Sequence, residues 1–167
     1  MRKALFTGMA LLSVLVSCGD SSSRPDAEPY VFHVQDFDSI SKASGAIVDV
    51  EYRSDSTLFG KRYYLADTAK VILEFNRQEE LQSVHWYNGK GQELWQENYY
   101  PSGQRMARFG KQVNEGTGAA FFHGAYKSYY QDGSVKECGE YENNQLLWNV
   151  HWESDGRKGD TIVYEYR

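Results

Sequence analysis

Cysteine and proline are scarce in this chain of 167 residues, which contains 2 Cys and 3 Pro. Two cysteines exclude the disulfide framework that holds many small secreted domains together. The chain has four histidines: His33, His85, His123 and His151. No two of them have the spacing of metal ligands, and no cysteine pair is present to join them. The sequence therefore predicts no metal site and no cofactor.

An excess of basic residues is also missing. If residues 1–17 are removed as a signal peptide, the mature chain of 150 residues (167 − 17) has 16 Lys plus Arg (18 − 2) against 23 Asp plus Glu. Its formal charge of −7 makes nucleic acid and electrostatic attachment to anionic lipid headgroups poor candidates. The length fits one domain.

Enzyme motifs are missing as well. Ser39 and Lys42 match Ser-x-x-Lys, but the partner motifs of that chemistry do not occur. Neither Gly89-Lys90-Gly91 nor Gly116-Thr117-Gly118 precedes a predicted helix. Both therefore lack the helix N-terminus that would bind a phosphate group. Nothing isolates two carboxylates in different environments, as a glycosidase requires. We therefore expect no catalytic residues and no enzyme activity. His85 and His151, each next to a Trp, are interpreted as surface histidines opposite the core.

The first hydrophobic run is short and begins after two basic residues. Arg2 and Lys3 precede an uncharged stretch, Ala4–Ser17, that is too short to span a bilayer. This pattern is typical of a secretory signal peptide over residues 1–17. The run ends in Leu15-Val16-Ser17-Cys18, which resembles the lipobox of bacterial lipoproteins.

The lipobox resemblance implies that Cys18 becomes the N-terminus, with diacylglycerol on its sulfur and a further acyl chain, such as palmitate, on its amine. Acyl chains contribute about 0.8 kcal/mol per buried methylene, so several chains anchor a protein stably. Gly19 follows the cysteine, and Asp20 comes one place too late for the inner-membrane retention signal. We therefore expect a lipid-anchored protein of the cell envelope, on the outer membrane. Residues 18–29 are polar and are interpreted as a flexible tether. With Cys18 acylated, Cys138 is expected to be alone and buried.

Residues 30–167 are rich in aromatic residues, with 13 Tyr, 8 Phe and 4 Trp in the chain, and glycine is plentiful at 15. This composition favours a β-sheet with many tight turns. Strands are predicted at 30–34, 47–52, 62–65 and 71–75, with a turn at 76–79. Further hairpin turns are predicted at Asn88-Gly89, Ser102-Gly103, Asp132-Gly133, Asn143-Asn144 and Asp155-Gly156, with Asn-Gly and Asp-Gly favouring type I′.

The run Leu146–Glu153 shows the clearest strand pattern. One face carries the apolar residues Leu146, Trp148, Val150 and Trp152, and the other carries Leu147, Asn149, His151 and Glu153. No amphipathic helix is expected after Cys18: the best candidate, Asp36–Ala46, lacks an apolar stripe, and its first part is predicted to be a loop. The fold class is therefore all-β: an elongated antiparallel meander of stacked hairpins.

Internal repeats support this fold. Tyr99-Tyr100-Pro101-Ser102-Gly103 recurs as Tyr129-Tyr130-Gln131-Asp132-Gly133, and Val84-His85-Trp86 recurs as Val150-His151-Trp152. The repeat turn positions are Gly89, Gly103, Gly133 and Gly156. The spacings are uneven, and Lys111–Ala120 is interpreted as an insertion.

The fullest copy, residues 123–146, resembles the bacterial variant of the MORN repeat. The matching residues are Gly124, Tyr129, Tyr130, Gly133, Gly139 and Tyr141. The resemblance covers residues 81–156 and implies hairpins stacked edge to edge into a twisted sheet. Many chains with such repeats are labelled antitoxins, which implies a cytoplasmic partner and disagrees with the signal peptide.

Aromatic pairs such as Tyr99-Tyr100 place one ring on each face of a strand. Either both faces are covered, or a row of rings is exposed and binds a glycan or a protein. We expect Trp86, Tyr99, Tyr129 and Trp152 to divide between the core and such a surface. The leading hypothesis is a non-enzymatic envelope lipoprotein that binds an unknown protein or glycan. The alternatives are a structural protein whose sheet edges pair with other copies, or an enzyme with a histidine and a carboxylate in contact in a cleft.

Overall fold

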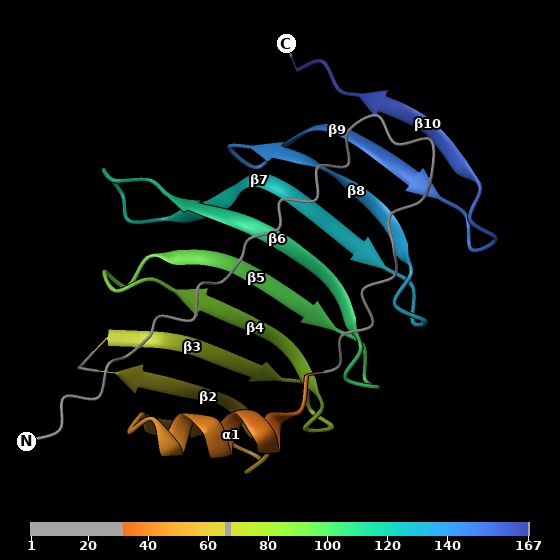
Figure 1. The fold of residues 1–167 in the computed structure, drawn as a ribbon. Coiled ribbons are helices and arrows are strands. Elements are labelled where there is room, and N and C mark those ends of the chain that lie inside the picture. The colour runs from red at the N-terminus through yellow and green to blue at the C-terminus, as the bar shows by residue number, and fades with distance from the viewer. Residues whose placement is uncertain (1–31, 66–67, 167) are drawn as a thin grey trace, which may run out of the picture.

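A computed structural model describes residues 32–65 and 68–166, and shows one antiparallel sheet of ten strands in chain order, β1 to β10 (Figure 1). A helix, α1 (Val34–Ala43), precedes the sheet. The strands are β1 (Ile47–Tyr52), β2 (Leu58–Leu65), β3 (Thr68–Phe75), β4 (Leu81–Tyr87), β5 (Glu93–Tyr99), β6 (Arg105–Val113), β7 (Ala120–Tyr129), β8 (Val135–Glu142), β9 (Gln145–Trp152) and β10 (Lys158–Val163). The predicted all-β meander is confirmed. No helix among the described residues is long and apolar enough to cross a membrane.

The helix α1 is a feature that the sequence analysis missed. Residues 32 and 33 are not in a strand and Val34 begins the helix, so the strand predicted at 30–34 is wrong where the structure describes it. The side of the helix that packs inwards carries Val34, Phe37 and the buried Ser41, whereas Ile40 is 67% exposed. A serine within the inward stripe and an isoleucine outside it conceal the helical period. Lys61 and Tyr63 of the sheet both bond the carboxylate of Asp38 and fix the helix in place.

Five hairpins of similar length build the sheet. The first strand of each hairpin ends in an aromatic residue directly before the turn. These residues are Tyr52, Phe75, Tyr99, Tyr129 and Trp152. These residues are 23, 24, 30 and 23 positions apart. The repeat therefore begins at β1, well before residue 81, where the sequence analysis placed its start. The long spacing coincides with the predicted insertion, whose residues form the ends of β6 and β7 and the loop 114–119 between them.

The five turns that follow the aromatic residues share one geometry. The first residue of each turn donates its N–H to the carbonyl of the fifth, and the fourth residue donates to the carbonyl of the first. The fourth residue has positive φ in all five: Ser56, Glu79, Gly103, Gly133 and Gly156. This is the hairpin in which a residue with positive φ follows a type I turn, and it replaces the type I′ turn that we expected. Asn143-Asn144, with positive φ at both residues, has the φ signs of type I′.

The turn between β4 and β5 corrects one predicted position. Its first residue is Asn88, so the fourth place belongs to Gly91, which has φ 74°, while Gly89 needs no positive φ. The Asn88 side chain accepts hydrogen bonds from the backbone N–H groups of Lys90 and Gln92 and so holds Asn88 as the first residue of the turn. The position with positive φ therefore lies at Gly91, two residues after Gly89.

The side chains that follow the aromatic residues join neighbouring hairpins. Tyr100 donates its hydroxyl to the carbonyl of Tyr129 at 2.9 Å, and Tyr130 donates to the carbonyl of Trp152 at 2.8 Å. Arg53 has the same role in the first hairpin, where it bonds the carbonyl of Phe75. Each bond runs from one hairpin to a later one and fixes their spacing.

Most of the rings that we expected at a binding surface lie in the core. Tyr99 (5% exposed), Tyr129 (1%) and Trp152 (1%) are buried, and Trp86 is half-buried against the same core as Tyr99. They point to the side of the sheet where the repeats bury their apolar residues, so these four positions do not form an exposed row. Cys138 is fully buried as expected, but it is disulfide-bonded rather than alone. Cys18 lies outside the described residues.

Candidate functional site

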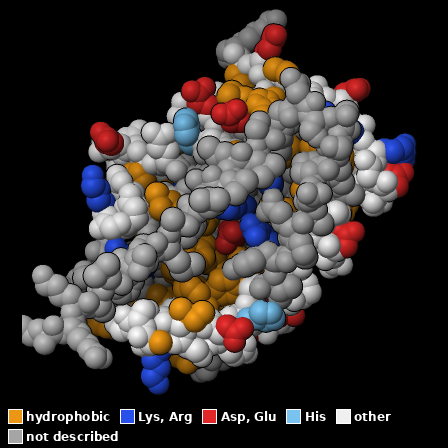
Figure 2. Space-filling model, viewed as in Figure 1, with side chains coloured by type: hydrophobic (Ala, Val, Ile, Leu, Met, Phe, Trp, Pro, Cys, Tyr) orange, Lys and Arg blue, Asp and Glu red, His pale blue; other side chains and the backbone are white. Residues whose placement is uncertain are grey.

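The two faces of the sheet differ in character. Phe37 of α1 packs against Tyr63 and Trp86, with ring centroids 4.9 and 6.0 Å apart, so α1 covers the face to which these residues point. Figure 2, viewed as in Figure 1, shows hydrophobic side chains in the lower half of the molecule and charged ones nearer its centre. His85 precedes Trp86 in β4 and therefore points to the opposite face. We call that opposite side the helix-free face.

Strand register places one row of side chains across the helix-free face. The row runs through Ile72, His85, Gln96, Phe109, Tyr126 and Gly139. Within this row His85 and Gln96 are polar, and Phe109 and Tyr126, which follow them, are aromatic. The candidate site lies where these two parts meet.

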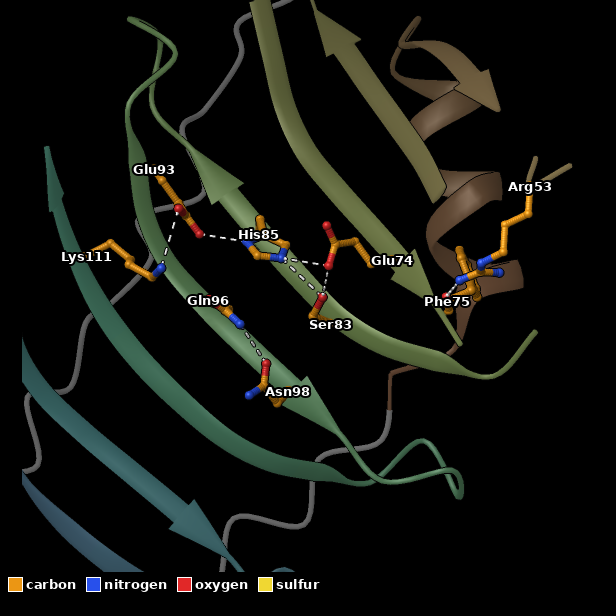
Figure 3. Close-up of polar contacts among 9 residues, drawn as sticks. All are labelled: Arg53, Glu74, Phe75, Ser83, His85, Glu93, Gln96, Asn98 and Lys111. Carbon is orange, nitrogen blue, oxygen red and sulfur yellow. Dashed lines mark hydrogen bonds and ion pairs between the residues drawn. The ribbon is translucent and has the colours of Figure 1, made fainter. Parts of the chain in front are cut away.

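A charged cluster of Glu74, Ser83, His85, Glu93 and Lys111 forms the polar part (Figure 3). Nδ1 of His85 lies 2.7 Å from Oε1 of Glu93, and its Nε2 lies 3.1 Å from Oγ of Ser83 and 3.5 Å from Oε2 of Glu74. Lys111 Nζ lies 3.7 Å from Oε2 of Glu93. The side chains of His85, Glu93 and Lys111 are 16%, 10% and 12% exposed. Glu74 is more open, at 42% exposed. Two positive and two negative groups therefore balance in a cluster that is enclosed around His85, Glu93 and Lys111.

The hydrogen bonds determine the protonation state of His85. The Ser83 hydroxyl donates its proton to Glu74 at 2.9 Å, so it accepts from Nε2 of His85. Nδ1 faces a carboxylate, so this nitrogen is also a donor. Burial alone lowers the pKa of His85, but the bonds to Glu74 and Glu93 outweigh burial and raise it to about 9. The imidazolium in turn lowers the pKa of Glu74.

This protonation state argues against a serine–histidine–carboxylate triad, although the residues have that order. A general base must be neutral to accept a proton from the serine. His85 is already charged at neutral pH, and the hydroxyl of Ser83 is buried and donates to Glu74. With His85 charged and Ser83 donating to Glu74, these two residues are not arranged as a general base and its nucleophile.

An open cavity of about 620 Å³ lies beside Glu93, at the end of the sheet opposite the five similar turns. The turn between β4 and β5 forms one wall and the inserted loop between β6 and β7 the other. The lining residues are Tyr87, Lys90, Gly91, Gln92, Glu93, Val113, Asn114, Glu115, Gly118 and Ala120. Its volume is that of a small-molecule site. The cavity therefore forms where the insertion interrupts the regular repeat.

An aromatic cluster of Phe109, Phe122, Tyr126 and Tyr141 continues the helix-free face beyond the charged cluster. Phe109 stacks on Tyr126 at 5.9 Å, and Phe122 lies 5.6 Å from Tyr141. Lys111 connects the two clusters, because its Nζ pairs with Glu93 and lies 4.3 Å from the centre of the Phe122 ring. Rings and charged groups therefore adjoin on one face.

Sequence reasoning placed some of these groups correctly and missed their contacts. His85 lies on the face opposite the helix-covered core, as expected, but its side chain is 16% exposed and so it is not the surface histidine that we predicted. Its contact with two carboxylates is of the kind that the enzyme alternative predicted. Glu74 and Ser83 face each other across β3 and β4, a register that the turn at 76–80 sets. Lys90 and Gly91, considered for a phosphate site, line the cavity instead. Ser39 is exposed on α1 and bonds the carbonyl of Gln35. In residues 32–65 and 68–166, no group of three acidic, His or Cys side chains is placed to hold a metal ion.

Comparison with known proteins yields a likeness of fold. No protein family matches the sequence, and the search of curated proteins finds no match. A chain in the crystal structure of the GtfA/B complex matches with a TM-score of 0.51 and 16% identity, over 82% of this chain and 24% of that one. The GtfA/B complex bound to UDP and GlcNAc gives 0.46 and 15% (88% and 28% covered), and Staphylococcus aureus TarM gives 0.38 and 11% (69% and 25% covered). This chain thus spans about a quarter of each. The first match supports the sheet architecture alone.

Proposed function

We propose that this protein is a non-enzymatic lipoprotein of the cell envelope that binds a glycan at the cavity on its helix-free face. The observation that carries the proposal is the position of the cavity. It forms where an insertion breaks a regular array of hairpins, and its wall includes Glu93 of the charged cluster. An irregular loop on a regular scaffold is where binding residues commonly lie.

The chemistry of the lining suits a ligand rich in hydroxyl groups. Gln92 carries an amide, Glu115 a carboxylate, Lys90 an ammonium group and Tyr87 a phenol ring. Burial, with nearby Glu93 and Glu74, raises the pKa of Tyr87 to about 12, so this phenol keeps its proton and can donate a hydrogen bond. Donors, acceptors and an aromatic ring around one cavity are the groups that recognise sugar hydroxyls and sugar rings.

The charged cluster supports binding rather than catalysis. A histidine held protonated between carboxylates fixes the position of Glu93, and Lys111 holds the same carboxylate from the other side. Groups locked by their neighbours lose little conformational entropy when a ligand binds.

A glycan array with the purified full-length protein tests the binding site. We expect binding to one class of saccharide, and at least a tenfold weaker affinity in Tyr87→Ala. Tyr52→Ala is the matched control, because Tyr52 is 65% exposed on β1 and does not line the cavity. Equal loss in both variants, or no saccharide bound by the wild type, would contradict the proposal. Binding to an envelope protein at the same residues would favour the protein partner instead.

The envelope location rests on the signal peptide and on acylation of Cys18, which lies outside the described residues. An acylated Cys18 cannot be the disulfide partner of Cys138, so the anchor requires Cys138 to be reduced or joined to another chain. We also retain the assignment of the hairpins to the MORN-like variant as part of the proposal. Mass spectrometry of the mature N-terminus should show a diacylglycerol-modified cysteine, and Cys18→Ser should release the protein from the outer membrane. Recovery of Cys18 in a disulfide-linked peptide would refute the anchor, because a sulfur bonded to diacylglycerol cannot also form a disulfide.

A structural role is the second candidate function. It is favoured by exposed apolar residues on the two edge strands, where Ile47 is 64% exposed on β1 and Val163 is 71% exposed on β10. Such edges can pair with other strands.

A further inference from the structure

The last strand of the sheet leaves one edge open. β10 has β9 as its one strand neighbour among the described residues, and all six of its residues are exposed. Thr161, Ile162 and Val163 form a β-branched run, with Ile162 51% and Val163 71% exposed. A β-branched, exposed edge is a site for strand addition unless charges or prolines protect it. Asp160 and Lys158 precede this run, but no charge interrupts it.

Head-to-tail pairing of β10 with β1 of another copy meets like charges. Where one hairpin meets the next within the chain, the eighth residue after the aromatic residue of one hairpin faces the residue just before the aromatic residue of the next. Gly60 faces Glu74 in this way, and Glu137 faces His151. If β10 and β1 of another copy paired in the same register, Asp160 would lie opposite Glu51. Like charges directly opposite each other in a sheet are destabilising.

We propose instead that β10 pairs with β10 of a second copy about a two-fold axis centred on Ile162. Tyr164 donates its backbone N–H to the carbonyl of Leu147 on β9. Because backbone groups alternate in direction along a strand, those of Thr161 and Val163 point away from β9 and towards a partner.

This two-fold register places compatible side chains opposite each other. Ile162 faces its own copy, Thr161 faces Val163, and Asp160 faces Tyr164. Pairs of β-branched residues stabilise antiparallel sheets, and none of these pairs joins like charges. A self-complementary contact of this kind closes as a dimer.

The dimer has a consequence for binding that rests on the proposed function, whereas the pairing itself does not. A two-fold axis perpendicular to the sheet keeps both helix-free faces on the same side. Tyr164, which bonds Asn149 on that face, then lies near the seam. Two cavities on one side of a continuous sheet increase the avidity for a polymeric ligand.

Cysteine crosslinking of the full-length protein in its native membrane tests the pairing. Two Ile162 residues in a non-hydrogen-bonded pair have Cα atoms about 4.5 Å apart, within the range of a disulfide. With a mild oxidant, Ile162→Cys should give a reducible dimer, and adding Val163→Lys should abolish it. Ile40→Cys, at a position 67% exposed on α1, is the control and should stay at the wild-type level.

Two results would overturn the two-fold dimer. One is Ile162→Cys crosslinking no more than the wild type and Ile40→Cys. The other is a dimer that forms when Ile162→Cys is combined with Asp49→Cys in a second copy, because that pair is adjacent in the head-to-tail register. Neither readout involves a glycan, so failure here is distinct from failure of the proposed function.

Discussion

The protonated His85 makes the stability of the protein depend on pH in a defined window. The folded protein raises the pKa of this histidine from 6.5 to about 9, through its bonds to Glu74 and Glu93 against the opposing effect of burial. Each pH unit between the two values corresponds to about 1.4 kcal/mol. Below pH 6.5 both the folded and the unfolded histidine are protonated, so the full contribution of about 3 kcal/mol is present. It declines as the pH rises from 6.5 and is lost at about pH 9.

Urea unfolding followed by tryptophan fluorescence measures this dependence directly. We expect the free energy of unfolding to fall by about 3 kcal/mol between pH 6 and 9.5, a range that stays below the ordinary pKa of tyrosine. His85→Gln should remove most of this slope and lower the stability at pH 6. His151→Gln is the control, because His151 also lies next to a Trp in the sequence but is 39% exposed, with its Nε2 4.0 Å from Glu153. If His85→Gln keeps the slope of the wild type, the assignment of an imidazolium locked between carboxylates is wrong.

Three further substitutions and one control, Gly89→Ala, test the packing and the charged cluster. Gly139→Ala should cost about 1–3 kcal/mol in urea unfolding, because a Cβ there lies 2.2 Å from the carbonyl oxygen of Trp148 and 2.7 Å from the Tyr126 ring; Gly89→Ala should be near neutral, with its closest contact at 3.9 Å. Tyr130→Phe should cost about 1 kcal/mol by removing the hydroxyl that bonds the next hairpin, and an unchanged unfolding midpoint would show that this bond is dispensable. Glu93→Gln should move the NMR titration of the His85 ring protons below pH 9, whereas an unmoved titration would assign the raised pKa to Glu74 alone.

Much of the fold follows from local sequence. Alternation and β-branched residues located β1 at its observed bounds, 47–52, and turn residues located most hairpins, because these signals act over a few neighbouring positions. The first hairpin escaped detection as a repeat because its turn has Ser56, and the second has Glu79, where later ones have glycine. The helix escaped because its inward stripe includes Ser41.

The candidate site depends on register between distant residues, and single-sequence patterns do not carry that information. Glu74 and Glu93 are 19 residues apart (93 − 74) and meet at His85 because bulges between β3, β4 and β5 set how these strands align. The four rings that we expected to divide between the core and a binding surface were chosen by residue type alone. Which face each ring occupies depends on the bulges before the turns, and these place Tyr99 and Tyr129 in the core.

The separation of the two ends of the sheet has a consequence for how such a protein can change in size. The five aromatic residues and the similar turns that follow them lie at one end of the strands, and the cavity lies at the other, between two connections of adjacent hairpins. Duplication or loss of a 23- or 24-residue hairpin outside the β4–β7 region would lengthen or shorten the array while leaving those two connections adjacent. Array length and ligand recognition are therefore separable traits, which evolution or protein engineering can alter independently.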